Sequence, residues 1–161
     1  MITPGPQTNG PAMNICGAIV PQRIRLNLKA RDKAGLLSLI AEDAAASTGL
    51  DQGAILATLS KREALGSTGV GNGIALPHAA IAGIESPFGL LVRLDHAIDY
   101  GSVDEKLVDI VFLLLTPPND PTADLSTLSA IARTLRSEDV LTALRQVATE
   151  TEAQAVWCGA V

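Results

Sequence analysis

Apolar and polar residues follow two different periods in the first third of the chain. Residues 23–30 alternate between polar and apolar, which predicts a short half-buried strand or an extended entry into a helix. From Asp32 the apolar residues recur every three or four positions as far as Thr48, and Gly49 follows as a stop signal. This part of the pattern predicts a strand and then a helix.

A second helix and an extended segment follow. Asp51 can cap a helix whose apolar residues keep to one face until Gly66 ends it. The apolar run "GIALPHAAI" predicts an extended segment that Pro77 stops, because proline has no N–H to donate to a strand ladder. We therefore expect His78 to leave the sheet at its edge.

The second half of the chain predicts two more strands and two more helices. Residues 89–94 and 108–115 suit strands, and the second run is so continuously apolar that we expect it at the centre of a sheet. Asp120 and Pro121 begin a helix in which apolar residues repeat at three- and four-residue spacing. These residues are Leu125, Leu128, Ala132 and Leu135. A last helix is predicted over 137–147, with a possible turn after it.

The alternation of helical and strand segments predicts an α/β fold with helices packed on a sheet. A length of 161 residues is enough for one domain with a proper core and is too short for two. We expect residues 21–161 to form this single domain. Residues 1–20 are rich in proline and glycine, and we expect them to be a disordered N-terminal extension.

Composition argues against several classes of function. The formal net charge is −5 and the basic residues do not cluster, which argues against nucleic-acid binding. The most apolar run, 107–116, is about half of the roughly 20 residues that span a bilayer, and Asp109 interrupts it. The first residues lack the basic and apolar regions of a signal peptide. We expect a cytoplasmic protein that does not insert into a membrane.

His78 is the candidate for chemistry, because it ends a glycine-rich run in a chain with 2 histidines. Such a histidine can be a metal ligand, a general base, a nucleophile or a structural residue. Metal binding is poorly supported, since the other histidine, His96, lies beyond a predicted strand, and Cys16 and Cys158 have no CxxC spacing. We expect neither a metal nor a cofactor.

The run "GSTGVGNG" before His78 fits neither of two well-known motifs. It is not the G-x-S-x-G elbow of serine hydrolases, and it lacks the lysine of a phosphate-binding P-loop. Closely spaced glycines do let backbone N–H groups approach an anion, and imidazole is a good nucleophile near neutral pH. Arg62 could neutralise the charge of that anion. Phosphoryl acceptance by His78 is therefore the most attractive hypothesis.

The stretches "REALGSTGVGNGIALPH", "IDYGSVDEKLVDIVFLLLTP" and "LSTLSAIARTLRSEDV" together resemble enzyme IIA domains of the phosphotransferase system, of the fructose/mannitol type. The resemblance is closest to the nitrogen-regulatory branch and covers roughly residues 27–156. It implies a mixed sheet flanked by helices on both faces. It also implies that His78 accepts a phosphoryl group from a phosphohistidine carrier protein, with Arg62 near the phosphate and with Ser67, Thr68 and Asn72 shaping the loop.

The nitrogen-regulatory branch has no fused sugar-transporting domain, and its phosphorylation state is read by other proteins, among them potassium-transport and sensor components. The resemblance thus implies a phosphotransferase component with a mainly regulatory role, whose oligomeric state stays open. A sugar-specific enzyme IIA that passes phosphate to the IIB domain of a transporter is the alternative within the same family.

This sequence departs from the family near the active histidine. The family usually has a second histidine at the start of a later helix, where this chain has Asp124. Asp124 could hold His78 in one tautomer, but its charge would repel a phosphoryl group, by about 1 kcal/mol at 4 Å in water. Ala79 and Ala80 stand where the family commonly has glycine and then a basic or small polar residue. A third hypothesis is therefore a binding module that is no longer phosphorylated.

Overall fold

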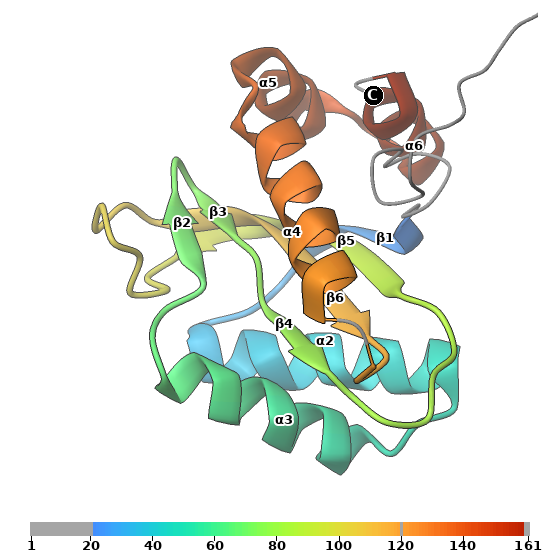
Figure 1. The fold of residues 1–161 in the computed structure, drawn as a ribbon. Coiled ribbons are helices and arrows are strands. Elements are labelled where there is room, and N and C mark those ends of the chain that lie inside the picture. Colours follow the sequence, from blue (N-terminus) through green and yellow to red (C-terminus); the bar gives the residue numbers. More distant parts are fainter. Residues whose placement is uncertain (1–20, 120, 160–161) are drawn as a thin grey trace, which may run out of the picture.

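The computed structural model describes residues 21–119 and 121–159. One sheet lies between two layers of helices, with α2 and α3 against one face and α4, α5 and α6 against the other (Figure 1). The predicted α/β architecture with helices on both faces is confirmed. The expected disordered extension, residues 1–20, lies outside the described residues.

The described part of the chain contains the predicted strands and helices together with some elements that were not predicted. In chain order they are β1 (Pro21–Leu28), α2 (Lys33–Thr48), α3 (Gln52–Ala64), β2 (Gly69–Gly71), β3 (Ile74–Ala75), β4 (His78–Ala80), β5 (Phe88–Ile98), β6 (Val108–Thr116), α4 (Pro121–Arg136), α5 (Glu138–Gln146) and α6 (Glu150–Gly159).

The first two helices begin and end where their capping residues predict. The Asp32 carboxylate accepts a hydrogen bond from the backbone N–H of Gly35, and Gly49 ends α2 in the left-handed conformation at φ 79°. Asp51 caps α3 in the same way, through the N–H of Ala54. These short local contacts set the direction of α3, whose last turn carries two residues of the site described below.

The sheet is mixed, and its strand order is β1-β5-β6-β3-β2, with β4 paired to β6. Strand β5 runs parallel to β1 and antiparallel to β6, while β3 and β4 both run parallel to β6. Strand β6 therefore lies at the centre, as its continuous apolar run predicts. Most of its residues are buried on both faces of the sheet.

The two faces of the sheet carry separate apolar cores. On one face, residues of α2 and α3 pack against alternate residues of β5 and β6, including Leu90 and Val111. On the other face, residues of α4, α5 and α6 pack against Leu91, Ile110 and Phe112. This alternation is the period-two pattern of a sheet buried on both sides.

The glycine-rich run is expected to be a loop, but part of it is paired strand. Strands β2 and β3 form an antiparallel hairpin whose two-residue turn is Asn72 and Gly73. Both residues have positive φ, at 58° and 83°, as a type I′ turn requires. A Cβ at Gly69 would also collide with Ser102, so that glycine lets β2 lie close to the segment between β5 and β6. Part of the run is thus ordered sheet.

Helix α4 presents a different face to the core from the predicted one. Leu125 is 65% exposed, and Leu128 and Ala132 are only partly buried, although Leu135 is buried as expected. The buried positions include Thr127, Ala130, Ile131 and Thr134. The pattern was misassigned because buried threonines count as polar. The predicted cap, Asp120, lies outside the described residues.

The end of the described chain is more regular than expected. Helix α5 begins after Ser137 and ends at Gln146, close to the predicted helix over 137–147. A ten-residue helix, α6, follows where only a turn was expected, and its buried Ala153 and Trp157 lie four residues apart on one face.

Candidate functional site

Strand β4 places His78 at the rim of the sheet. Pro77 interrupts the ladder between β3 and β4, yet its carbonyl still accepts a hydrogen bond of 3.0 Å from the N–H of Leu114. His78 is the first residue of β4 and pairs with Leu114 of the central strand. The expectation that His78 leaves the sheet was wrong, because pairing resumes directly after Pro77. His78 is partly buried there.

A backbone contact fixes the tautomer of the His78 ring. Nδ1 lies 2.7 Å from the carbonyl oxygen of Leu76. A carbonyl oxygen only accepts hydrogen bonds, so Nδ1 carries the proton that is donated to it. In the neutral ring the lone pair is then on Nε2, which is the nitrogen able to act as a nucleophile.

The surroundings of His78 favour the neutral ring. Burial is the largest cause that lowers its pKa, and the positive charge of Arg62 lowers it further. The Leu76 carbonyl and the Glu63 carboxylate act in the opposite direction, but the pKa still falls below the ordinary value of 6.5. The imidazole is therefore uncharged near neutral pH.

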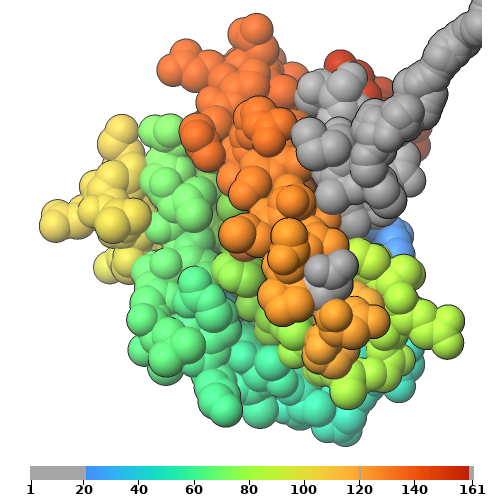
Figure 2. Space-filling view, viewed as in Figure 1, coloured from blue at the N-terminus to red at the C-terminus, as the bar shows by residue number. Residues whose placement is uncertain are grey.

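His78 opens onto a hollow of about 250 Å³ between β4 and the start of α4. Asp124 lines the same hollow from the first turn of α4, and its Oδ2 accepts a hydrogen bond of 3.0 Å from the Thr116 hydroxyl. The remaining lining residues are apolar: Ala79, Ala80, Leu114, Pro121, Leu125 and Leu128. Figure 2 shows α4 next to the light-green segment that contains β4 on this face.

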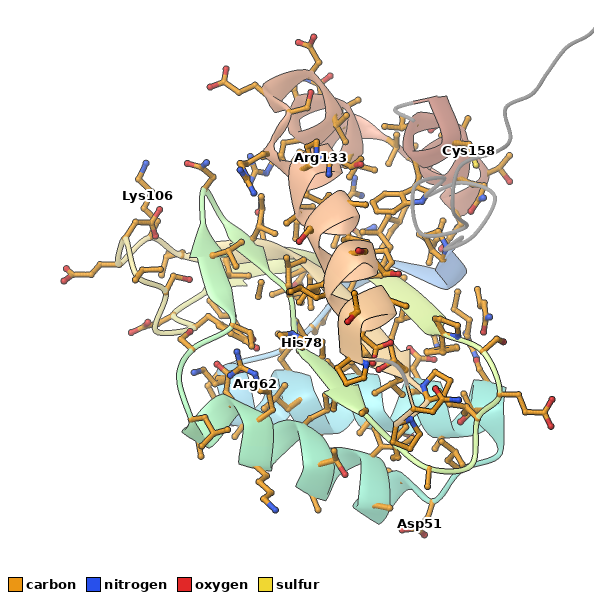
Figure 3. All side chains as sticks on the ribbon, viewed as in Figure 1. Asp51, Arg62, His78, Lys106, Arg133 and Cys158 are labelled. Carbon is orange, nitrogen blue, oxygen red and sulfur yellow. The ribbon has the colours of Figure 1, made fainter. Side chains whose placement is uncertain are left out.

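Arg62 approaches the site from the last turn of α3. Its Nη1 donates a hydrogen bond of 2.9 Å to the carbonyl oxygen of Gly66, which holds the guanidinium over the start of the glycine-rich run. Its charge acts on the His78 pKa, and Figure 3 shows the two side chains in the same part of the molecule. A cation thus stands near the reactive ring.

Ser67 and Thr68 shape the turn between α3 and β2. The Ser67 hydroxyl accepts a hydrogen bond from the N–H of Gly69, which is an ordinary turn-stabilising contact. Thr68 is buried, and both its N–H and its hydroxyl donate to the carboxylate of Glu63, at 2.9 and 2.6 Å. Ser67 is exposed, so the two neighbours differ in their surroundings.

Asn72 does not line the hollow beside His78. It stands at the tip of the β2–β3 hairpin, where its N–H donates to Asp104 and its carbonyl accepts from Arg145. It lines a second hollow of about 460 Å³, together with Lys106 and Arg136. The structure therefore brings His78 and Asp124 together and places Asn72 elsewhere.

Sequence reasoning missed Glu63 and Tyr100, which lie beneath the turn after α3. The Tyr100 hydroxyl is 3.3 Å from the Glu63 carboxylate and 2.9 Å from the Thr68 hydroxyl. Burial raises the pKa of the Tyr100 phenol, so it stays protonated at neutral pH. Both residues lie in sequence stretches that carry the family resemblance, which could have pointed to them. Glu63 directly follows Arg62, and Tyr100 is the tyrosine of "IDYG".

The described residues contain neither a cluster of metal ligands nor a helix that could span a membrane. Within residues 21–119 and 121–159, no group of three or more histidine, cysteine, aspartate or glutamate residues is placed to hold a metal ion. In the same part of the chain no helix combines the length and hydropathy needed to cross a bilayer.

Comparison with known proteins places this site in a family. Residues 19–156 match the family model described as "Phosphoenolpyruvate-dependent sugar phosphotransferase system, EIIA 2". A "Nitrogen regulatory protein" of Bradyrhizobium diazoefficiens is 40% identical over 145 residues, which cover 90% of this chain and 93% of that protein. A protein of the same name from Pseudomonas aeruginosa is 36% identical over 81% of this chain and 86% of its own length.

Solved structures agree with the sequence comparisons. The nitrogen regulatory protein IIA-Ntr of Neisseria meningitidis superposes with a TM-score of 0.79 at 28% identity, over 83% of this chain and 92% of that one. The mannitol IIA of Escherichia coli has a TM-score of 0.69 at 17% identity, over 83% and 94%. At that lower identity the likeness shows a common fold.

Proposed function

We propose that this chain, which belongs to the EIIA 2 family of the phosphoenolpyruvate-dependent sugar phosphotransferase system, accepts a phosphoryl group on Nε2 of His78. The observation that carries the proposal is the hydrogen bond from Nδ1 to the Leu76 carbonyl, which leaves the Nε2 lone pair available. The lowered pKa of His78 keeps that lone pair unprotonated near neutral pH.

The donor in this proposal is a phosphohistidine carrier protein. Nε2 attacks phosphorus in line with the donor P–N bond, and a new P–N bond forms as the old one breaks. The electron pair of the broken bond returns to the carrier imidazole. The His78 ring keeps its proton on Nδ1, and the Leu76 carbonyl stabilises the positive charge that the ring gains.

Arg62 and the hollow provide the surroundings for this transfer. The guanidinium of Arg62 offers positive charge to the phosphoryl oxygens. It can bind them after releasing the Gly66 carbonyl, or it can keep that hydrogen bond through Nη1 and bind a phosphoryl oxygen through another nitrogen. The apolar walls of the hollow limit water near the phosphorylated ring. Asp124 opposes the effect of Arg62, because its carboxylate repels the phosphoryl oxygens.

The finer assignment within the family is a regulatory relay. The relatives with the highest identity quoted above are nitrogen regulatory proteins by name. In the proposed function, other proteins distinguish the phosphorylated chain from the unphosphorylated one, with potassium-transport or sensor proteins as candidate targets. A phosphoryl group adds about 1.5 to 2 negative charges to a hollow with apolar walls, which is a large change for a docking partner.

A sugar-specific role is the second candidate. The mannitol IIA of Escherichia coli, which shares this fold, has been solved in complex with phosphorylated enzyme IIB of the mannitol system. If this chain were sugar-specific, phospho-His78 would pass its group to the IIB domain of a transporter. Mixing the phosphorylated chain with such a domain and following loss of the group distinguishes the two candidates.

Intact-mass measurement tests phosphoryl acceptance. The chain is incubated with phosphoenolpyruvate, enzyme I and the carrier protein, and His78→Ala and His96→Ala variants are treated alongside. We expect one acid-labile, alkali-stable phosphoryl group on the unsubstituted chain and on His96→Ala, and none on His78→Ala. No adduct on the unsubstituted chain, with a carrier shown to be active, would contradict the proposal and favour a binding module that is not phosphorylated.

A further inference from the structure

Four hydrogen bonds converge on the carboxylate of Glu63, whose side chain is 7% exposed. Lys33 Nζ donates at 2.8 Å, the Thr68 N–H at 2.9 Å and the Thr68 hydroxyl at 2.6 Å. The Tyr100 hydroxyl lies at 3.3 Å. These donors come from the start of α2, from the turn after α3 and from the segment after β5, so one side chain ties three parts of the fold together.

The contact to Thr68 continues through the backbone to His78. The carbonyl of Thr68 accepts a hydrogen bond of 2.9 Å from the N–H of Leu76. The carbonyl of Leu76 in turn accepts the 2.7 Å hydrogen bond from Nδ1 of His78. Thr68 and Leu76 are therefore the two residues between the Glu63 carboxylate and the His78 ring. Each link between residues is a hydrogen bond of ordinary length.

We infer that Glu63 is a positioning residue for phosphoryl acceptance, which holds the Leu76 carbonyl against Nδ1 of His78 by fixing Thr68. The inference rests on the proposed function of His78. It adds a role to a residue that touches neither the ring nor the phosphoryl group. Loss of this contact leaves the Thr68 side chain its hydrogen bond with Tyr100 but removes the anchor on α3, and the Leu76 carbonyl then no longer selects one tautomer of His78.

The charges around His78 allow a positioning role to be separated from a merely structural one. The charges of Arg62 and Glu63 on α3 act on the ring, and Asp124 lines the hollow beside His78 from α4. Glu63→Gln removes a carboxylate that raises the His78 pKa and leaves the charge of Lys33 without its partner, so the pKa should fall further. General loosening that admits water to the ring would raise it instead, because burial is what lowers it.

The first measurement is nitrogen-15 NMR of the His78 ring in the unphosphorylated full chain and in Glu63→Gln. In the unsubstituted chain we expect one tautomer, with the proton on Nδ1. In Glu63→Gln we expect signals of mixed tautomers and a lower pKa. A His78→Gln variant assigns the signals. An unchanged tautomer in Glu63→Gln would overturn the inference, whatever the pKa, because loss of the Glu63 charge lowers the pKa by itself.

Asp43→Asn is the matched control. Asp43 is also a carboxylate with a side chain that is 7% exposed, and it accepts hydrogen bonds from Arg25 at 2.7 and 2.9 Å. It belongs to α2 and pairs with Arg25 of β1, so its loss removes a partly buried ion pair of similar kind away from the turn after α3. We expect the His78 tautomer in Asp43→Asn to match the unsubstituted chain. A tautomer change of equal size in both variants would indicate general loosening and overturn the inference.

The second measurement is the rate of phosphorylation by the carrier. We expect Glu63→Gln to react at least about 10-fold more slowly than Asp43→Asn, because misplacement of a reacting group is costly. If the unsubstituted chain itself is not phosphorylated, the proposed function fails, while the NMR comparison still decides whether Glu63 orients the ring. If the unsubstituted chain and Glu63→Gln are phosphorylated at equal rates, only the positioning role fails.

Discussion

The proposed reactivity of His78 depends on groups that neighbouring residues place around its ring. The Leu76 carbonyl fixes the proton on Nδ1, and burial with the nearby charge of Arg62 keeps the ring neutral. Neither effect requires a metal or a second histidine. A neutral imidazole with one exposed lone pair is the minimum that phosphoryl acceptance needs.

The lowered pKa of His78 predicts how both reaction and stability depend on pH. The folded chain binds the proton less readily than the unfolded chain, so unfolding is favoured as the pH falls below about 6.5. The same protonation removes the nucleophile. We expect the phosphorylation rate to be level above pH 6.5 and to fall only at lower pH, with the unfolding free energy falling in that same window.

The measurement is a rate profile between pH 5 and 8, together with urea unfolding at the same pH values. His78→Gln serves as the control for stability, because it lacks the titrating ring and should lose less stability on acidification. If acidification from pH 8 to pH 7 already slowed phosphorylation, the result would contradict the lowered pKa of His78.

Asp124 is expected to shorten the life of the phosphorylated state. It lines the hollow with His78, and its charge repels a phosphoryl group by about 1 kcal/mol at about 4 Å in water, which corresponds to roughly a fivefold effect. Asp124→Asn removes the charge and keeps an oxygen for the Thr116 hydroxyl. We expect its phosphorylated form to lose the group several-fold more slowly.

The loss of the phosphoryl group is followed by intact mass after the carrier is removed. Thr116→Val is the control, since it deletes the hydrogen bond to Asp124 without changing charge. Equal lifetimes for Asp124→Asn and the unsubstituted chain would mean that the carboxylate does not act on the phosphoryl group.

At the residue scale, the sequence predicted two residues that the structure brings to one hollow, His78 and Asp124, but missed the residues that support them. The motif singled out His78, and Asp124 was recognised as a departure beside it. Glu63 and Tyr100 were missed because their contact joins residues that are 37 positions apart, and no local period reports such a contact. Asn72 was grouped with the loop residues, but the hairpin turn carries it to another hollow.

Helix boundaries were predictable because capping is local. Asp32 and Gly49 bracket α2, and Asp51 begins α3, each through contacts within four residues. The β2–β3 hairpin was missed although Asn72 and Gly73 are a strong turn signal, since the glycines around them conceal any strand period. The buried face of α4 includes threonines, which a hydrophobic pattern counts as polar. A threonine can be buried in a helix when its hydroxyl donates a hydrogen bond within the helix, as the Thr134 hydroxyl does to the carbonyl of Ala130.

The cap of α3 should contribute to stability without affecting the chemistry of the site. Asp51 lies at the opposite end of the helix from Arg62, and its carboxylate accepts the N–H of Ala54 at 2.9 Å (Figure 3). We expect Asp51→Ala to lower the unfolding free energy by about 1 kcal/mol, and Asp51→Ser to restore most of it. Both variants should be phosphorylated at the rate of the unsubstituted chain.

Urea unfolding and the phosphorylation assay check this prediction together. A rate loss in Asp51→Ala that Asp51→Ser does not restore would show that the first turn of α3 contributes to the site.

The whole molecule supports the site through two cores, one on each face of the sheet. Strand β6 belongs to both cores and also pairs with β4, which carries His78. Its central position could be predicted, because residues 108–115 are apolar except for Asp109, which suits a strand that is covered on both faces. The order of the other strands depends on long-range pairing, which the apolar pattern alone does not specify.

Trp157 is the largest side chain of the core that contains α4, α5 and α6. It is fully buried and stacks on Phe112, with ring centroids 5.0 Å apart and planes at 22°. We expect Trp157→Ala to lower the unfolding free energy by about 3 to 5 kcal/mol, a large part of a typical domain's stability. Trp157→Phe should lose clearly less, because a ring still packs on Phe112.

Circular dichroism during urea unfolding measures both variants, since the substitution removes the single tryptophan that fluorescence would follow. If Trp157→Ala were as stable as the unsubstituted chain, α6 would not be part of the cooperative core.

The most direct test of the account is to identify the phosphorylated nitrogen. The nitrogen-15-labelled chain is phosphorylated by the carrier, and phosphorus-31 and nitrogen-15 NMR together locate the P–N bond on the His78 ring. The account predicts phosphorus on Nε2 with a proton still on Nδ1, as the Leu76 carbonyl requires. Phosphorus on Nδ1, or on a residue other than His78, would contradict it.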